Sequence, residues 1–361
     1  MNDHHHMQIA LRLARRGLGT TFPNPAVGCV IVKHEQIIGL GVTAPGGRPH
    51  AEVTALAMAG REAEGATVYV TLEPCCHHGR GAPCSEALIA ARVSRVVIAV
   101  KDHDRRVDGG GIEALKQAGI EVSEGLYRDE AISINKGFFS VIDQGRPTVT
   151  LKLATSMDGK IATNSGESKW ITGPQSRQFG HMLRARHDAI MVGVNTVIID
   201  NPELTCRIPG LESQSPTRII IDTNLRTPAD CQLISTHKDV PTWIVTTIEK
   251  PADFPDIPFI HALENKDGRI DLRHAISLLS TRGITRLMVE GGGELAASLL
   301  VADLIDEIYW LRAPIILGND GIPAVGTMML SQIQDAPRFK RQSMTMCGED
   351  VVEHLIAALN H

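Results

Sequence analysis

The chain has 361 residues, of which 43% are hydrophobic and 21% are charged, as is typical of soluble globular proteins. Its net charge of −5 and its aromatic content of 4% do not favour a nucleic-acid-binding protein, which usually presents a basic face with stacking aromatic rings. No apolar run approaches the roughly 20 residues that span a bilayer, so we expect no membrane partner. A chain of this length usually forms two domains.

The cysteine content indicates a reducing environment. Seven cysteines are an odd number in a large chain, which argues against a disulfide framework and predicts a cytoplasmic protein. The first residues also lack the basic and apolar stretches of a secretory signal peptide. A small anionic substrate, bound by a few arginine and lysine side chains, fits this composition best.

The first part of the chain alternates helix and strand patterns. Apolar periodicity and β-branched runs predict helices over 7–16, 51–60, 85–92 and 111–119, and strands over 27–32, 66–72 and 95–100. Such alternation is typical of a layered α/β fold. The polar stretch 143–147 then indicates a boundary, which divides the chain into domains 1–145 and 146–361.

The second part alternates in the same way. The patterns predict strands over 148–154, 189–192, 218–222, 243–247, 286–290 and 308–317, and helices over 174–186, 272–279 and 294–301. The loop 201–215 is rich in proline and serine, and we assign it no regular structure.

A metal-binding pattern lies in the first part. His50, Cys75 and Cys84 fall at predicted junctions between strands and helices, where helix N-termini stabilise thiolates. Three nitrogen and sulfur ligands leave one position of a tetrahedral zinc ion free for water, as in catalytic sites. Glu52 follows two residues after His50 and matches the general acid/base of zinc deaminases. The alternative is a purely structural zinc, for which Cys76 is the candidate fourth ligand.

A longer match surrounds these ligands. The first part resembles the deaminase half of the bifunctional riboflavin biosynthesis deaminase/reductase family, and the matching stretches are 23–28, 50–52, 71–75 and 77–84. The resemblance implies a cytidine-deaminase-like three-layer domain with one Zn²⁺. It also implies that Asn24, His77 and Arg80 hold a pyrimidine and its ribose phosphate; a guanidinium such as that of Arg80 pairs well with phosphate oxygens. Two stretches depart from the family pattern, at Val42-Thr43 and over 102–105.

The residues of the second part give weaker signals by themselves. Glu290 to Ala296 reads as a strand end, a glycine turn and a helix, which allows backbone N–H groups to approach a phosphate. A plain tight turn explains the same pattern. Trp170 and several arginines are candidates for binding aromatic or phosphate groups, or are ordinary surface and core residues.

The second part of the chain also resembles this family, and the resemblance implies more specific site residues. The stretches 152–160, 166–172, 184–190, 200–207 and 290–292 are similar to its reductase half, whose fold is like dihydrofolate reductase. The resemblance implies an NADPH site and a substrate site. The implied NADPH contacts are Ala154, Trp170, Thr196, Asp200, Thr223, Gly291, Gly292 and Gly293. The implied substrate contacts are Lys152, Ser168, Arg184, Leu204, Arg207 and Glu290.

The sequence therefore predicts a cytoplasmic enzyme of riboflavin biosynthesis with two activities. The first domain is expected to deaminate 2,5-diamino-6-ribosylamino-4(3H)-pyrimidinone 5′-phosphate, and the second to reduce the ribosyl chain with NADPH. Asp200 is the candidate proton donor for the reduction. The resemblance also implies a homo-oligomer, a dimer or larger. The rival hypotheses are a deaminase that edits nucleic acids and a zinc scaffold without catalysis.

Overall fold

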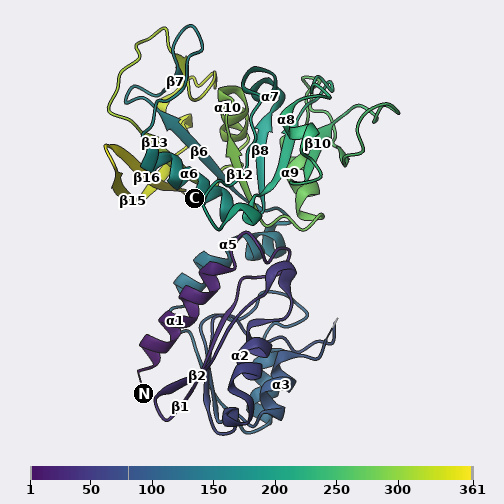
Figure 1. Cartoon of the computed structure of the whole chain (residues 1–361), viewed down its shortest axis with the longest axis vertical. Helices are drawn as coiled ribbons and strands as arrows, with labels where there is room; N and C mark the ends of the chain where they lie inside the picture. Colours follow the sequence, from purple (N-terminus) through teal and green to yellow (C-terminus); the bar gives the residue numbers. More distant parts are fainter. Residues whose placement is uncertain (1, 80, 359–361) are drawn as a thin grey trace. The chain divides into compact units, whose positions relative to one another are not determined.

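The computed structural model describes residues 2–79 and 81–358, and it divides the chain into two compact units, Met1–Gly145 and Arg146–His361. Each unit has its own sheet and its own helices (Figure 1). None of the described helices combines the length and the apolar character that a membrane crossing requires.

The first unit is built on a five-stranded sheet in the order β2-β1-β3-β4-β5. Strands β1 and β2 and strands β1 and β3 pair antiparallel, whereas β3, β4 and β5 are parallel. The strands are β1 (Gly28–Lys33), β2 (Gln36–Val42), β3 (Thr67–Val70), β4 (Arg95–Ile98) and β5 (Glu121–Glu124). The central strands β1 and β3 are almost wholly buried, as expected for a sheet that is covered on both faces.

Helices cover both faces of this sheet and complete three layers. Helix α1 contacts α5 on one face. On the other face, α2 contacts α3, and α3 contacts α4. The helices are α1 (Asp3–Arg16), α2 (Ala51–Ala59), α3 (Cys84–Ala90), α4 (Gly110–Gln117) and α5 (Arg128–Gln144), with short 3-10 helices at Pro45–Gly47 and Gly60–Ala63. The predicted elements are confirmed, apart from small shifts at their ends, whereas β2, β5 and α5 were not predicted.

Two glycines allow helices to pack closely on the sheet. An added Cβ at Gly28 would lie 1.9 Å from the carbonyl oxygen of Ala10 in α1, and one at Gly41 would lie 1.9 Å from that of Ala51 in α2. Only glycine fits at such a close approach of two backbones. Gly41 therefore fixes the depth at which the first turn of α2 lies against β2.

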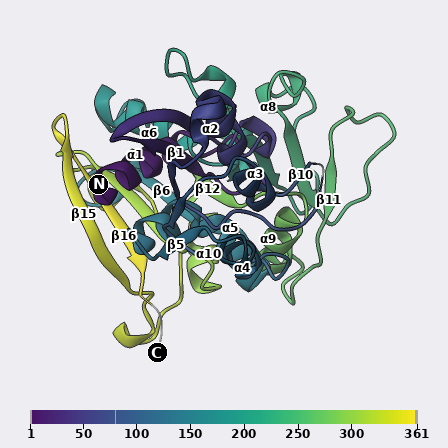
Figure 2. The ribbon, with the colours of Figure 1, turned by 90° about the horizontal axis from the view of Figure 1, so that it is seen from below.

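The second unit is built on a nine-stranded sheet in the order β11-β10-β9-β8-β12-β6-β13-β16-β15. Figure 2 shows β15 and β16 toward one edge of this sheet and β10 and β11 toward the other. The strands from β11 to β13 are parallel, and β16 runs antiparallel to both of its neighbours. They are β6 (Thr148–Thr155), β8 (Ala189–Gly193), β9 (Thr217–Ile221), β10 (Thr242–Thr246), β11 (Phe259–His261), β12 (Arg286–Glu290), β13 (Glu307–Arg312), β15 (Phe339–Cys347) and β16 (Asp350–Ala357). A small separate pair joins β7 (Lys160–Ala162) to β14 (Ile322–Pro323).

The helices of this unit are α6 (Pro174–Ala185), α7 (Val194–Asp200), α8 (Gln232–Ser235), α9 (Leu272–Ser280) and α10 (Gly293–Val301), with 3-10 turns at Glu212–Gln214 and Ile333–Asp335. Nearly all of the predicted elements are confirmed. The predicted strand 308–317 is wrong in its length, because β13 ends at Arg312. The loop 201–215 contains one short 3-10 turn, where no regular structure was expected.

Candidate functional site

Three metal-ligating side chains meet in the first unit. His50, Cys75 and Cys84 are brought together so that their ligand atoms all lie within 4.8 Å of one another. The Nδ1 atom of His50 lies 3.3 Å from Sγ of Cys84 and 3.7 Å from Sγ of Cys75. Ligands of a tetrahedral zinc ion with ordinary bond lengths are separated by roughly 3.5 Å. The three side chains therefore fit a zinc ion in both chemistry and spacing.

The local folds of two helix starts position these ligands. His50 is the residue before α2, and Cys84 is the first residue of α3. The loop that begins at Cys75 closes on α3, because both the backbone N–H and the hydroxyl of Ser85 donate to the Cys75 carbonyl at 3.1 Å. The backbone N–H of Cys84 also donates to Sγ of Cys75 at 3.3 Å. The start of α3 thus offers one backbone hydrogen-bond donor to the sulfur of Cys75 and supplies the other thiol, that of Cys84.

The two thiols are electrostatically unequal. Hydrogen bonds from the Cys84 thiol and from His50 lower the pKa of Cys75 to about 4, against the opposing effect of burial. The hydrogen bond to Cys75 and burial raise the pKa of Cys84 well above its ordinary value. The Cys75 thiol is therefore the first of the pair to ionise.

Glu52 lies beside this group and is not one of its members. It is in the first turn of α2 and only 3% exposed. Burial raises the pKa of its carboxyl group to about 7. A carboxyl group in such a position can accept and return a proton near neutral pH.

Cys76 faces away from the metal-ligating group. Its Sγ atom is 3.5 Å from the carbonyl oxygen of Arg106 and 3.9 Å from that of Val107. An added Cβ at Gly110 would lie 2.7 Å from this sulfur, so Cys76 packs against the loop before α4. The structure therefore gives no support to Cys76 as a fourth ligand.

Two other predicted contacts of the first unit lie near the ligands in the chain. Asn24 packs against Gly47, in the turn that precedes His50, where an added Cβ would lie 1.7 Å from its Nδ2 atom. His77 follows the Cys75-Cys76 pair and is half-buried, and its Nδ1 atom is buried without a hydrogen-bond partner among the described residues. Arg80, the third predicted contact, lies outside the described residues.

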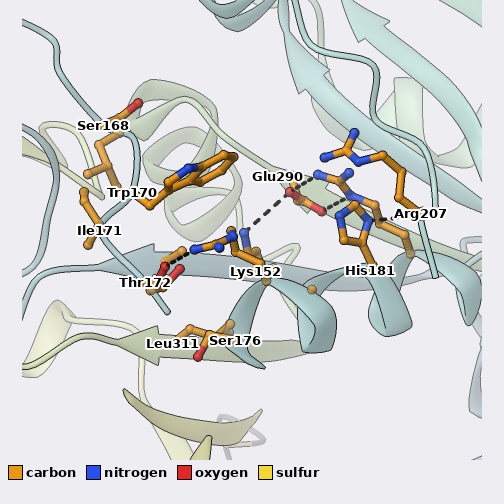
Figure 3. A pocket seen from close by; sticks show the side chains of 15 residues that line it. Lys152, Ser168, Trp170, Ile171, Thr172, Ser176, His181, Arg207, Glu290 and Leu311 are labelled. Atoms are coloured by element: carbon orange, nitrogen blue, oxygen red, sulfur yellow. Dashed lines mark hydrogen bonds and ion pairs between the residues drawn. The ribbon is translucent and has the colours of Figure 1, made fainter. Parts of the chain in front are cut away.

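The second unit contains a cavity of about 230 Å³. It is lined by residues of β6, β7, β13, α6, the loop before α6, the loop after α7 and the end of β12. Seven of the predicted NADPH and substrate contacts belong to this lining, namely Lys152, Ala154, Ser168, Trp170, Arg184, Arg207 and Glu290. Figure 3 shows Ser168 and Trp170 on one side of Glu290 and His181 and Arg207 on the other.

Glu290 is the charged centre of this cavity. Both of its carboxylate oxygens accept hydrogen bonds from Arg184 at 2.8 Å, and Nζ of Lys152 lies 3.5 Å away (Figure 3). Burial alone would raise the pKa of Glu290, but the charges of Arg184 and Lys152 hold it well below its usual range. The carboxylate is therefore ionised and is an acceptor for a ligand at any ordinary pH.

The lining as a whole is positively charged. Lys152, Arg177, Arg184 and Arg207 are cationic and Glu290 is the one carboxylate, so four minus one gives a net charge of +3. Burial and the two neighbouring arginines lower the pKa of His181, which keeps its imidazole neutral near pH 7. In a chain of net charge −5, this cavity is suited to an anionic ligand.

The remaining predicted contacts lie outside the described lining of this cavity. Gly291 and Gly292 have positive φ angles of 84° and 82° and pack on the side chain of Thr196, so these three residues lie together. Gly293 begins α10, Thr223 follows β9, and Asp200 is the exposed last residue of α7. The side chain of Leu204 is buried in the apolar core of the unit.

Sequence reasoning missed part of the lining. Helix α6 contributes Arg177, Gly180, His181 and Arg184, which are spaced as neighbours on one face of a helix. Arg184 was predicted, and its helical spacing back to Arg177 is the signal that could have found the others. Leu311 on β13 carried no comparable signal.

Comparison with known proteins assigns both units. The family model described as the cytidine and deoxycytidylate deaminase zinc-binding region matches residues 1–100, and the RibD C-terminal domain matches residues 147–353. The riboflavin biosynthesis protein RibD of Escherichia coli is 42% identical over 99% of this chain and 100% of its own length. The RibD protein of Aquifex aeolicus is also 42% identical, over 97% of each chain.

Solved structures agree with these relatives. RibD of Acinetobacter baumannii superimposes with a TM-score of 0.88 at 37% identity and covers 99% of each chain. A Thermotoga maritima protein named diaminohydroxyphosphoribosylaminopyrimidine deaminase/5-amino-6-(5-phosphoribosylamino)uracil reductase has the same TM-score and coverage at 31% identity. The chain therefore belongs to the RibD family of riboflavin biosynthesis and is a bifunctional deaminase and reductase.

Proposed function

We propose that the first unit deaminates 2,5-diamino-6-ribosylamino-4(3H)-pyrimidinone 5′-phosphate and that the second unit then reduces the ribosyl chain of the product to ribityl. The two activities named for the Thermotoga maritima relative support both steps. The boundary between the two activities is proposed at Gly145 and Arg146, where the compact units divide. The observation that carries the proposal is the His50, Cys75 and Cys84 group with Glu52 buried beside it.

For the deamination, we assign His50, Cys75 and Cys84 as the ligands of one zinc ion. Zinc, when bound, lowers the pKa of a coordinated water and so supplies a nucleophile near pH 7. Glu52 accepts one proton of the attacking water and delivers it to the ring nitrogen. It then transfers the remaining hydroxyl proton to the amino group, which departs as ammonia while the carbonyl forms. Burial raises the pKa of Glu52 to about 7, which suits a group that must both take and give a proton.

We further assign Asn24, His77 and Arg80 to the binding of this substrate. Asn24 lies in contact with the turn before His50, and His77 offers a buried ring nitrogen without a partner among the described residues. The assignment of Arg80 rests on its place in the sequence motif alone.

For the reduction, we assign the cavity around Glu290 to the ribosylaminouracil phosphate and to the reactive end of NADPH. The cofactor, when bound, supplies the hydride. Lys152, Ser168, Arg184, Arg207 and Glu290 hold the substrate, and the net positive lining attracts its phosphate. We also assign Leu204 to the binding of the substrate, through its backbone.

The contacts to NADPH lie partly inside and partly outside this cavity. Ala154 and Trp170 line it, whereas Thr196 and the glycines Gly291, Gly292 and Gly293 form a close-packed turn at the start of α10. Backbone N–H groups at such a helix start are suited to a phosphate of the cofactor. Thr223 and Asp200 complete the proposed NADPH contacts.

Asp200 is also our candidate proton donor for the reduction. It stands at the end of α7, the helix that carries Thr196. Lys152 is the alternative, because its ammonium group lies inside the cavity and beside Glu290.

We propose that the protein works in the cytoplasm as a homo-oligomer. All seven cysteines are free thiols, which suits a reducing compartment. Strand β15 is the edge of the nine-stranded sheet and pairs only with β16 among the described strands. Its Met344 and Met346 point to one face, and each is 62% exposed. A second copy of this strand would pair with the open edge and place its own apolar side chains beside Met344 and Met346 on the same face.

We expect Glu52→Ala to lower the rate of deamination by about 100- to 10,000-fold, the usual contribution of general acid–base catalysis. The zinc content should stay at one per chain, because Glu52 is not a ligand. Ammonia release from the diaminopyrimidine phosphate and metal analysis measure the two effects. The exposed Glu64→Gln change in the same unit is the control. Near-normal deamination or loss of zinc in Glu52→Ala would contradict its assigned role.

We expect Cys75→Ser and Cys84→Ser to lose zinc and to unfold at a lower temperature, because metal binding is coupled to folding. Cys76→Ser is the matched control, since its sulfur faces the loop before α4 and should not affect zinc content. Metal analysis and thermal unfolding of the purified variants measure both properties. Zinc loss in Cys76→Ser with retention in Cys84→Ser would reverse the ligand assignment.

We expect a substitution in one proposed site to impair only the activity of that site. Given already deaminated substrate, Glu52→Ala should oxidise NADPH at the normal rate, because residues at separate sites act independently. Asp200→Ala should slow NADPH oxidation while ammonia release continues unchanged. Lys152→Met provides the comparison for the proton donor. Normal reduction by Asp200→Ala, together with abolished reduction by Lys152→Met, would move the proton donor to Lys152.

The proposed assembly predicts a mass in solution of at least twice that of one chain. Replacing both Met344 and Met346 with lysine should reduce the mass to that of a single chain, because charges on an exposed edge strand oppose pairing. Light scattering during gel filtration measures the mass. A wild-type protein that elutes as a single chain would exclude the homo-oligomer.

A further inference from the structure

We infer that Arg177 is a positioning residue for Trp170 and that, through this ring, it sets the affinity of the second unit for NADPH. The inference rests on the proposed reductase function. It starts from the exposure of Trp170, which lines the cavity and yet leaves 66% of its surface open. An aromatic ring of this size beside a polar cavity is a surface on which a planar ligand can stack. In Figure 3 the indole of Trp170 projects toward the cavity from the loop that precedes α6.

Arg177 fixes this ring from one side. Its guanidinium carbon lies 4.5 Å from the centroid of the indole, which is the geometry of a cation–π contact. Its Nη1 atom also donates to the carbonyl oxygen of Thr172 at 2.8 Å. Trp170 and Thr172 belong to the same loop, whereas Arg177 belongs to α6. The arginine therefore holds the loop and its indole against a regular helix.

The charge of Arg177 is not neutralised by any carboxylate among the described residues. The two other arginines of the cavity do have such partners, because Arg184 binds Glu290 and Arg207 binds Glu203 at 2.8 Å. Among the described residues, the Arg177 guanidinium has one cation–π contact, with the indole ring, and one hydrogen bond, to a carbonyl oxygen. Its full positive charge remains at a cavity that we assign to anionic ligands.

The indole of Trp170 and the guanidinium of Arg177 together form a surface on which a planar ligand can stack. The guanidinium covers part of the indole, and the rest of the ring is available to a planar heteroaromatic group such as nicotinamide. A ring held in one orientation loses less freedom when the ligand binds, so the affinity rises without a change in the chemical step. Arg177 therefore acts on the binding of the cofactor through Trp170 and takes no part in hydride or proton transfer.

The test compares Arg177→Met and Arg177→Lys with the wild type in the full chain. We expect Arg177→Met to raise the KM for NADPH by about tenfold, in line with a partly desolvated cation–π contact, with kcat within about twofold. Arg177→Lys keeps the charge and loses the planar stack, so we expect an intermediate rise of about threefold. The rate of ammonia release should not change. The KM for the deaminated substrate should rise less than the KM for NADPH, because Arg177 is only one of the four cations that line the cavity.

The matched control is Arg282→Met. Arg282 also donates one hydrogen bond to a backbone carbonyl, that of Leu278, but it is exposed and lies outside the cavity. A second readout needs no ligand. Acrylamide quenching of the Trp170 emission, isolated by subtracting the matching Trp170→Phe protein, should increase in Arg177→Met and stay unchanged in Arg282→Met.

The outcomes are distinct. Unchanged Trp170 quenching in Arg177→Met, or a KM for NADPH equal to that of Arg282→Met, would overturn the inference. So would a fall in kcat with an unchanged KM, or a rise confined to the KM of the pyrimidine substrate. If Arg177→Met does not fold, Arg177→Lys decides by the same criteria. A wild-type protein that does not oxidise NADPH would instead count against the reductase function, while the quenching measurement still tests the pairing.

Discussion

The carboxylate of Glu290 joins three elements of the second unit, and the position of the cavity depends on it. Glu290 ends β12, Lys152 lies beside it in register on β6, and Arg184 reaches it from α6. A buried carboxylate without partners is strongly unfavourable, so these elements must keep their relative positions. Arg184 also donates to the carbonyl oxygen of Thr205 at 2.9 Å, which ties the loop that carries Arg207 to the same charge. The ion pairs of Glu290 with Lys152 and Arg184 thus hold these elements together and also form the polar lining of the cavity.

In the first unit, the buried carboxylate of Glu73 joins separate elements, as that of Glu290 does in the second unit. The carboxylate of Glu73 accepts backbone N–H groups from Asp102, Gly109, Gly111 and Ile112 at 3.0 to 3.2 Å. Two of these donors belong to the first turn of α4, where a negative charge is favourable. Glu73 therefore fastens the end of the chain segment that leads to Cys75 onto the loop and helix beside it. Cys75 follows two residues later, so the same contacts limit where its side chain can lie.

The sequence allowed the meeting of the three metal-ligating side chains to be predicted, because two of them stand at starts of helices and the third lies in the loop that leads to α3, and their residue types and spacing indicate the chemistry. His50, Cys75 and Cys84 could be proposed without tertiary information. Glu73 could not, because the N–H groups that it binds are backbone atoms of a distant loop. The hairpin of β15 and β16 was missed for another reason. Strand β15 is exposed on both faces at the edge of its sheet, so it lacks the alternation that marks a half-buried strand.

The two stretches that depart from the family pattern lie outside the metal-ligating group. Thr43 is buried, and its hydroxyl accepts the backbone N–H of Val27 at 3.0 Å, so this residue stabilises the end of the sheet. In the second stretch, Asp102 accepts the N–H of Asp104, whose own carboxylate binds Arg106. Thr43 is thus bound to the residue before β1, and Asp102 and Asp104 are bound to residues that follow them. None of these contacts involves His50, Cys75 or Glu52. Neither stretch contributes a side chain to the His50, Cys75 and Cys84 group, so the geometry of that group is built from residues that keep the family pattern.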